Sequence, residues 1–251
     1  MLKRRGAGVG INAGIIERLF SWLLVGGFIG AHLFAVLAYY PGQIAEDPWI
    51  LLRVWEHLSS FGGMIGGEIA LLLFMNKTTP GLSKSDRMQF LNLVAFVFPF
   101  ALAMGRVGCA VVHDHPGRLT TIPVAVSLQS EASLRFVSVT FDPQSLSSLQ
   151  SSTRNVGFHD LGLYELFFLV LVLIPVFLRI DKRAKKPPSF GMLFLLMYMP
   201  VRFLLDFLRI ADATYAGLTP AQWMCAVALI GLAVSYLISR RSLIIADAGT
   251  N

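Results

Sequence analysis

Two arginines lie in segments that a lipid bilayer would surround with hydrocarbon, and they are the first residues to ask about chemistry. Arg106 follows the apolar run 90–104, and Arg202 lies inside the apolar run 190–208. A charged side chain at the bilayer centre costs roughly 2.5–3.5 kcal/mol on insertion scales, so each arginine is expected to have a partner. A guanidinium group binds phosphate oxygens through paired hydrogen bonds, and membrane lipids supply phosphate. An anionic phospholipid is therefore the first partner to consider.

Asp206 and Arg209 extend this pattern beyond Arg202. The spacing i, i+4, i+7 places the three side chains on one face of a helix, with the acid between two bases. Such a face carries a net positive charge, which suits a phosphate. The alternative is a charge-balanced group that only holds helices together. That alternative applies to Asp206 with Arg209 more than to Arg106, which has no acidic neighbour in its own segment.

Polar residues also open the apolar segment that begins at residue 161. Residues 159–165 read H-D-L-G-L-Y-E. Tyr164 has a plain alternative to a binding role, because tyrosine is a common anchor at the membrane interface. Glu165 is an acid inside an apolar segment and is expected to have a partner, and His159 precedes it in a loop at the same depth.

The run His-Asp-His at 113–115 raises the question of a metal. Three consecutive residues lack the i, i+4 spacing that aims two ligands from a helix at one ion. The sequence therefore predicts no metal site, and a loop close to a phosphate site is the preferred interpretation.

The elements that position these residues are membrane helices. The chain has 251 residues, of which 55% are hydrophobic and only 14% charged, and its mean hydropathy is +0.65. This composition excludes an ordinary soluble domain. We predict an all-α polytopic membrane protein with about six spanning helices. Their approximate ranges are 15–40, 57–75, 89–107, 161–179, 190–208 and 221–239.

Glycines recur in the first two of these helices, at 26–30 and 62–67. Small residues let helix backbones approach closely in lipid. Tight packing is therefore the first interpretation of these glycines, and a lipid pocket is the alternative.

Basic residues are distributed unevenly between the loops. Fourteen of the 21 lysines and arginines fall at the termini or in the loops near residues 77–87 and 179–186. The positive-inside rule predicts a cytoplasmic N-terminus and a cytoplasmic C-terminus, with the loops 41–56, 108–160 and 209–220 outside. The net charge of +6 follows from this topology, so it gives no argument for binding nucleic acid.

The long polar stretch 108–160 predicts a small mixed periplasmic head. It holds short alternating runs at 121–127 and 134–141, which indicate strands, and a serine-rich linker at 145–152. The expected organisation is therefore helices 1–3 within 1–107, the head within 108–160, and helices 4–6 within 161–251.

Five short motifs in a fixed order resemble the prolipoprotein diacylglyceryl transferase family, whose bacterial enzymes lipidate lipoprotein precursors. The resemblance runs from about residue 26 to about residue 223. The motifs are G-A-H-L at 30–33 with Y-Y-P at 39–41, V-W at 54–55 through G-G-M-I-G at 62–66, G-R-V-G at 105–108 with Gly117, H-D-L-G-L-Y-E at 159–165, and R-F with D-F and R at 202–209.

The resemblance implies a cofactor-free transfer of a diacylglyceryl group in the bacterial inner membrane. The donor would be phosphatidylglycerol and the acceptor the cysteine thiol of a prolipoprotein signal peptide, with other membrane lipids as neighbours. Arg106, Arg202 and Asp206 are the expected catalytic residues. The expected substrate-binding residues are Gly105, Gly108, Asp114, Gly117, His159, Tyr164, Glu165, Arg209 and His57.

The chain departs from the family at several polar positions. Phe61 stands where the family has histidine, and Cys109 stands where it has asparagine. The family's second asparagine, its glutamate and an arginine are replaced by Val112, Asp114 and His32. His57, four residues before Phe61, is expected on the same helical face as a partial substitute for the missing imidazole. A helix that precedes this region in the family is expected to be absent.

These departures leave three functions open. The first is the diacylglyceryl transferase. The second is an enzyme that binds phosphatidylglycerol but uses another acceptor. The third is a non-catalytic lipid-binding protein, which would retain the arginines for a phosphate and lack the groups that activate a nucleophile.

Overall fold

The computed structural model describes residues 13–78, 83–113, 115–122, 125–127, 157–183, 189–210 and 213–248. Within these ranges it describes side chains between Gly14 and Ser239. The predicted strand at 134–141 and the linker at 145–152 lie outside the described residues, as does the candidate site residue Asp114.

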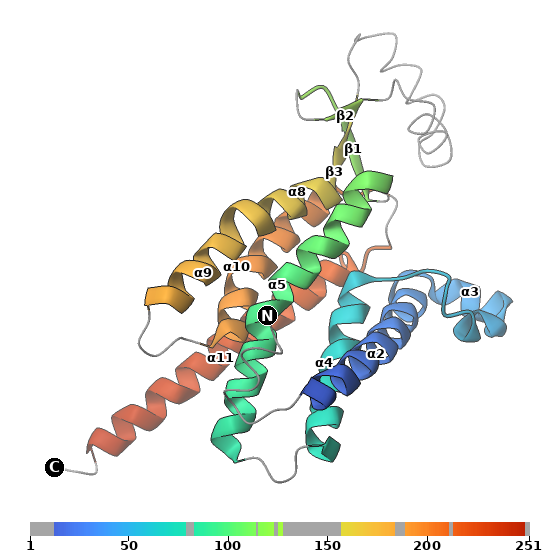
Figure 1. Cartoon of the computed structure of the whole chain (residues 1–251). Helices are drawn as coiled ribbons and strands as arrows, with labels where there is room; N and C mark the ends of the chain where they lie inside the picture. Colours follow the sequence, from blue (N-terminus) through green and yellow to red (C-terminus); the bar gives the residue numbers. More distant parts are fainter. Residues whose placement is uncertain are drawn as a thin grey trace. The chain divides into compact units, whose positions relative to one another are not determined.

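Long helices make up most of the described chain, as the composition predicts (Figure 1). The N-terminal part contains α2 (Ala13–Tyr39), α3 (Pro41–Glu46), the short 3-10 helix η2 (Pro48–Leu52), α4 (Ser60–Thr78) and α5 (Lys84–Val112). The C-terminal part contains α8 (Leu161–Phe168), the π-helical turn η3 (Leu169–Leu173), α9 (Ile174–Arg183), α10 (Phe190–Leu205), the 3-10 turn η4 (Asp206–Leu208) and α11 (Pro220–Ala248).

Five helical stretches among the described residues are long and apolar enough to cross a membrane. They are Gly14–Tyr39, Lys84–Val112, Leu161–Arg183, Phe190–Leu208 and Pro220–Ser239. The fold class is therefore a mostly helical protein with several membrane spans. The predicted segment 57–75 is helical from Ser60 onward, as part of α4. This helix is not among the five, because Glu68, Asn76 and Lys77 lower its hydropathy.

The strands form a small antiparallel sheet in the order β1-β3-β2. β1 (Pro116–Thr120) pairs with β3 (Gly157–Asp160), and β2 (Val126–Ser127) pairs with the other edge of β3. Among the described residues of the strand predicted at 121–127, those in a strand are Val126 and Ser127. β3 runs directly into α8, so this sheet is attached to the first turn of a membrane helix.

The chain divides into two compact units that do not follow the sequence order. The first contains residues 1–97, 188–195 and 213–251, and the second contains residues 98–187 and 196–212. The helices α5 and α10 contribute to both units. Arg106, Glu165 and Arg202 belong to the second unit.

In the first unit, α2 and α4 lie side by side and touch through glycines (Figure 1). A Cβ atom added to Gly30 would lie 2.5 Å from the carbonyl oxygen of Gly62 and 2.6 Å from Cα of Gly66. One added to Gly26 would lie 2.5 Å from Cβ of Ala70. Side chains at these positions would push the backbones apart, which supports tight packing as the role of the glycines.

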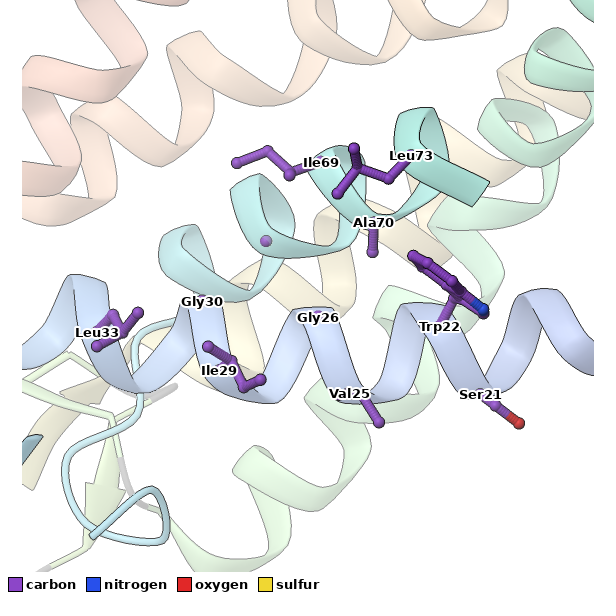
Figure 2. Close-up of a pocket in the computed structure, with 11 residues that line it drawn as sticks. Ser21, Trp22, Val25, Gly26, Ile29, Gly30, Leu33, Ile69, Ala70 and Leu73 are labelled. Carbon is purple, nitrogen blue, oxygen red and sulfur yellow. The ribbon is translucent and has the colours of Figure 1, made fainter. Parts of the chain in front are cut away.

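An apolar groove of about 560 Å³ follows this helix pair (Figure 2). Trp22 points from α2 toward α4, and Ala70 points back toward α2. The Nζ atom of Lys77 lies 5.5 Å from the centre of the Trp22 ring. The small residues that bring the backbones together thus also leave open space beside the contact.

His32 joins α2 to the segment that follows it. This side chain is fully buried, with Nδ1 2.6 Å from the carbonyl oxygen of Glu56 and Nε2 2.9 Å from that of Ile50. His32 therefore fixes the chain between α3 and α4 against the end of α2.

Candidate active site

The carboxylate of Glu165 lies between two buried arginines. Nε of Arg106 is 2.8 Å from Oε2 of Glu165, and Nε of Arg202 is 3.3 Å from Oε1. The Tyr198 hydroxyl donates a 2.7 Å hydrogen bond to Oε2. All four residues are at most 3% exposed. The two arginines predicted from the sequence are therefore brought together, and the partner that Arg106 lacks in its own segment comes from another helix.

Three helices supply this group. Arg106 comes from the second half of α5, Glu165 from α8, and both Tyr198 and Arg202 from α10. Because Tyr198 and Arg202 are separated by four residues, they occupy one face of α10. Three long apolar helices thus bury charges that compensate each other, which lowers the free-energy penalty of placing each one at membrane depth.

Asp206 provides a second carboxylate beside Arg202. Its Oδ1 atom is 2.9 Å from Nη1 of Arg202 and 3.9 Å from Nη1 of Arg209. The predicted order, an acid between two bases, is confirmed. The prediction of one continuous helical face is wrong for Arg209, because α10 ends at Leu205 and Arg209 has an extended backbone after the turn η4.

Arg209 and Gly117 form an isolated antiparallel bridge, which joins the end of α10 to the sheet. Gly117 is buried, and a Cβ atom there would lie 2.8 Å from the carbonyl oxygen of Leu208 and 3.0 Å from Cβ of His159. Gly117 is thus required for a close backbone approach. Three guanidinium groups and two carboxylates meet in this region, which leaves an excess of positive charge.

The other side of Arg106 faces Cys109 and His115. Nη1 of Arg106 is 3.3 Å from Nε2 of His115 and 3.7 Å from Sγ of Cys109. A guanidinium group can only donate, so Nε2 of His115 is the acceptor and a neutral His115 carries its hydrogen on Nδ1. Cys109, at the position of a family asparagine, keeps a weaker acceptor beside the arginine.

Asp160 organises the junction between the sheet and α8. Its side chain caps the helix by accepting a hydrogen bond from the Leu163 amide at 3.0 Å, and its other oxygen is 2.6 Å from Nδ1 of His113. The amide of Leu161 donates to the carbonyl oxygen of His115 at 3.0 Å. These contacts hold the end of α5 against the start of α8, one turn before Glu165.

His159 and Tyr164 form a separate pair at the same junction. Nδ1 of His159 is 2.9 Å from the Tyr164 hydroxyl. Partial burial lowers the pKa of His159 below its usual value. This pair was predicted to lie near Glu165, and it does so because Tyr164 is the residue directly before Glu165 in the sequence.

The remaining candidate residues that the structure describes are not members of the arginine group. Gly105 and Gly108 lie on the exposed side of α5 with open space around each. His57 belongs to the first unit, has a positive φ of 47° and stacks on the Tyr40 ring at 4.2 Å. The predicted helical face shared by His57 and Phe61 is wrong, because α4 begins at Ser60.

Sequence reasoning missed Tyr198, and it named His113, His115 and Asp160 only as members of the runs 113–115 and 159–165, without a role for each side chain. Tyr198 had a usable signal, since a polar group four residues before Arg202 shares its helical face. Asp160 had one as well, because aspartate directly before an apolar helical run is a common N-cap. Among the described residues, no three histidine, cysteine or acidic side chains gather as metal ligands would.

Chemically, this arrangement presents fixed positive charge in a dry environment. Each guanidinium group has five N–H groups, and both arginines use several of them, since Arg106 also contacts His115 and Arg202 also contacts Asp206. Buried guanidinium groups held in place by carboxylates stabilise negative charge that develops on phosphate oxygens.

The family model of prolipoprotein diacylglyceryl transferase matches residues 1–238 of this chain. Several proteins named phosphatidylglycerol-prolipoprotein diacylglyceryl transferase are similar to it. That of Proteus mirabilis is 30% identical over 229 residues, which cover 89% of this chain and 76% of the relative. That of Pasteurella multocida is 32% identical over 210 residues, 82% and 67% of the two chains. That of Escherichia fergusonii is 29% identical over 215 residues, 84% and 71%.

Proposed function

The chain belongs to the prolipoprotein diacylglyceryl transferase family, and from this premise we propose that it transfers the diacylglyceryl group of phosphatidylglycerol to the cysteine thiol of a prolipoprotein signal peptide. It is a multi-pass membrane protein of a bacterial family. The observation that carries the proposal is the pair of buried arginines, Arg106 and Arg202, held by the two oxygens of Glu165.

The reaction needs this kind of electrostatic environment. A thiolate sulfur attacks the glycerol carbon that bears the phosphate, the carbon–oxygen bond breaks, and its electron pair moves onto the departing phosphate. Negative charge therefore grows on the phosphate oxygens in the transition state. Fixed guanidinium groups lower the barrier because they need no reorganisation when this charge forms. We assign this role to Arg106 and Arg202.

Other residues are assigned supporting roles in the same proposal. Asp206 orients Arg202 and Arg209, and Glu165 holds Arg106 and Arg202 through its two oxygens. The proposed binding residues for the head group and signal peptide are Gly105, Gly108, Asp114, Gly117, His159, Tyr164, Arg209 and His57. His57 is included only because it carries an imidazole.

The test is the release of glycerol phosphate. Purified protein in phosphatidylglycerol vesicles is mixed with a peptide that carries a signal-peptide cysteine, and with a matched peptide in which serine replaces that cysteine. The proposal requires release with the first peptide only, together with a mass increase of that peptide by one diacylglyceryl group. Arg106→Lys should abolish most of the release, because lysine cannot form the planar fork. An inert wild type would contradict the proposal.

A second candidate is a phosphatidylglycerol-binding protein without transferase activity. The observation that favours it is Phe61, which is 5% exposed and occupies the position of a family histidine. This candidate predicts lipid binding that depends on Arg106 and Arg202, with no glycerol phosphate from any signal peptide. An acceptor other than a lipoprotein would instead give release with a different thiol or hydroxyl compound.

A further inference from the structure

His113 and Asp160 form a histidine–carboxylate pair beside the arginine group. Nδ1 of His113 is 2.6 Å from Oδ2 of Asp160. The carboxylate is fully buried, whereas the imidazole is 39% exposed. One member of the pair is thus fixed inside the protein and the other can be reached from outside.

Asp160 is held rigidly by its second contact. Its Oδ1 accepts from the Leu163 amide while Oδ2 faces His113, so the side chain cannot turn without losing the α8 cap. A carboxylate can only accept, so Nδ1 of His113 must carry hydrogen. In the neutral ring the lone pair is therefore on Nε2, which is the tautomer that a general base needs.

The His113 ring is positioned on a second side as well. It packs edge-on against Phe158 in β3, with the ring centres 6.2 Å apart and the planes at 86°. Among the described residues, Nε2 of His113 has no hydrogen-bond partner. The accessible nitrogen of an oriented imidazole is thus available to a bound molecule.

The backbone of His113 is unusual for this side chain. It follows the last residue of α5 with φ of 53°, in the left-handed region where glycine or asparagine normally ends a helix. Histidine does not end a helix better than glycine or asparagine would at this position. The position is thus explained by the imidazole and its contact with Asp160.

Asp160 also lies close to Glu165 along the chain. The two residues are five apart at the start of α8, which is about 7.5 Å along a helix axis. His113 directly follows α5, the helix that carries Arg106. The pair is thus linked to the arginine group through both α5 and α8.

Neighbouring histidines are less suited to act as a base. Nε2 of His115 already accepts from Arg106, and Nδ1 of His159 faces the Tyr164 hydroxyl. Other titratable or charged residues also lie on the described elements around His113. They are Arg106 and Cys109 in the second half of α5, His115 before β1, Arg118 in β1, His159 and Asp160 in β3, and Tyr164 and Glu165 in α8.

We propose that His113 is the general base of the transfer reaction and that Asp160 is its positioning residue. The inference rests on the proposed function. Nε2 of His113 takes the proton from the acceptor thiol, the sulfur forms a bond to the glycerol carbon, and the bond from that carbon to the phosphate oxygen breaks with its electron pair. Glycerol phosphate leaves, and the imidazolium returns its proton to the product phosphate or to water. His113 thereby supplies the imidazole that Phe61 does not.

The first test compares His113→Asn and His113→Gly with the wild type in phosphatidylglycerol vesicles. Both substitutions suit the left-handed backbone, so the fold is retained and thermal unfolding reports this directly. Release of glycerol phosphate should fall about 100-fold or more. In His113→Gly, added imidazole should restore part of it. The pH dependence of the rate that remains in the variants should then follow the ionisation of the peptide thiol, near pH 8.5, and no longer the ionisation of a histidine.

The second test uses Asp160→Asn and does not depend on turnover. The amide keeps an oxygen for the α8 cap but presents N–H to Nδ1 of His113, which moves the ring hydrogen to Nε2. ¹⁵N chemical shifts of His113, assigned by comparison with His113→Asn, should show hydrogen on Nδ1 in the wild type and on Nε2 in the variant. Release should fall as in His113→Asn while thermal stability stays close to that of the wild type.

The outcomes separate this inference from the function on which it rests. Wild-type rates in His113→Asn, or hydrogen on Nε2 of His113 in the wild type, overturn the base assignment and leave the transferase intact. A wild type that releases no glycerol phosphate overturns both. Phosphatidylglycerol binding should be unchanged in His113→Asn, and a loss as large as that in Arg106→Lys would show that His113 binds lipid and is not the base.

Discussion

Tyr198 on α10 donates its hydroxyl hydrogen to the carboxylate of Glu165 on α8, at 2.7 Å and without exposure to solvent. The tyrosine therefore completes the coordination of a carboxylate whose two oxygens also face Arg106 and Arg202. Because a hydrogen bond to a charged group is stronger than one between neutral groups, this contact should be measurable in the stability of the protein.

Tyr198→Phe tests that contact. The substitution removes one buried hydrogen bond to a charged acceptor and should lower the free energy of unfolding by about 1.5–3 kcal/mol. The matched control is Tyr164→Phe, which removes the partly exposed bond to His159 and should have a smaller effect. Unfolding in detergent micelles measures both. Equal losses would show that burial of the Glu165 contact adds nothing.

Glu165→Gln should be more damaging. It removes the shared negative charge from two buried guanidinium groups, and breaking a buried ion pair from one side costs roughly 3–5 kcal/mol. Glu68→Gln is the control, since Glu68 is an exposed acid on α4. Combining Glu165→Gln with Arg202→Gln should cost less than the sum of the single changes. Additive losses would contradict the shared-carboxylate arrangement.

Lysine substitutions test lipid recognition. Arg106→Lys and Arg202→Lys keep the charge but lose the fork, so phosphatidylglycerol binding should weaken about tenfold or more. Arg209→Lys should have a smaller effect because Arg209 is 27% exposed and more distant from Asp206. Native mass spectrometry with defined lipids gives the affinities. Unchanged lipid preference in both buried-arginine variants would remove the phosphate site.

The predicted topology is testable with single cysteines at positions 77, 147 and 182 in a variant without Cys109 and Cys225. The positive-inside rule places 77 and 182 in the cytoplasm and 147 outside. An impermeant maleimide applied to intact cells with a permeable outer membrane should label only position 147. Labelling at positions 77 and 182 without labelling at 147 would show that the protein has the opposite orientation in the membrane.

His159 predicts one component of the pH dependence of stability. Its pKa is lowered in the folded protein, so below about pH 6.5 the unfolded chain takes up the proton first. Stability is therefore lost as the pH falls from that value through the lower folded pKa, with no contribution from this group at higher pH. His159→Gln should reduce the loss of unfolding free energy between pH 7 and pH 5. If the variant loses as much stability over this range as the wild type, the loss comes from other histidines.

The sequence was sufficient to predict features formed by residues close together in the chain, and it did not predict contacts between distant residues. Apolar runs were enough to predict the five candidate spans among the described residues, and a four-residue spacing was enough to predict the Arg202–Asp206 pair. The Glu165–Arg106 pair joins helices 59 residues apart in the chain, and no periodicity encodes which helices become neighbours. The left-handed backbone of His113 was also beyond prediction, because its residue type gives no signal for that conformation.

One carboxylate that holds two arginines has a consequence for the evolutionary history of the site. Neither arginine can be replaced alone without leaving unbalanced charge at membrane depth, so a descendant that stopped catalysing would still keep both for its fold. Their presence in a sequence is thus a poor marker of activity. The imidazole of His113 is partly exposed and carries no buried charge, so it can change more readily than the arginines once turnover is no longer selected, and it marks a position where an active lineage and an inactive one will differ.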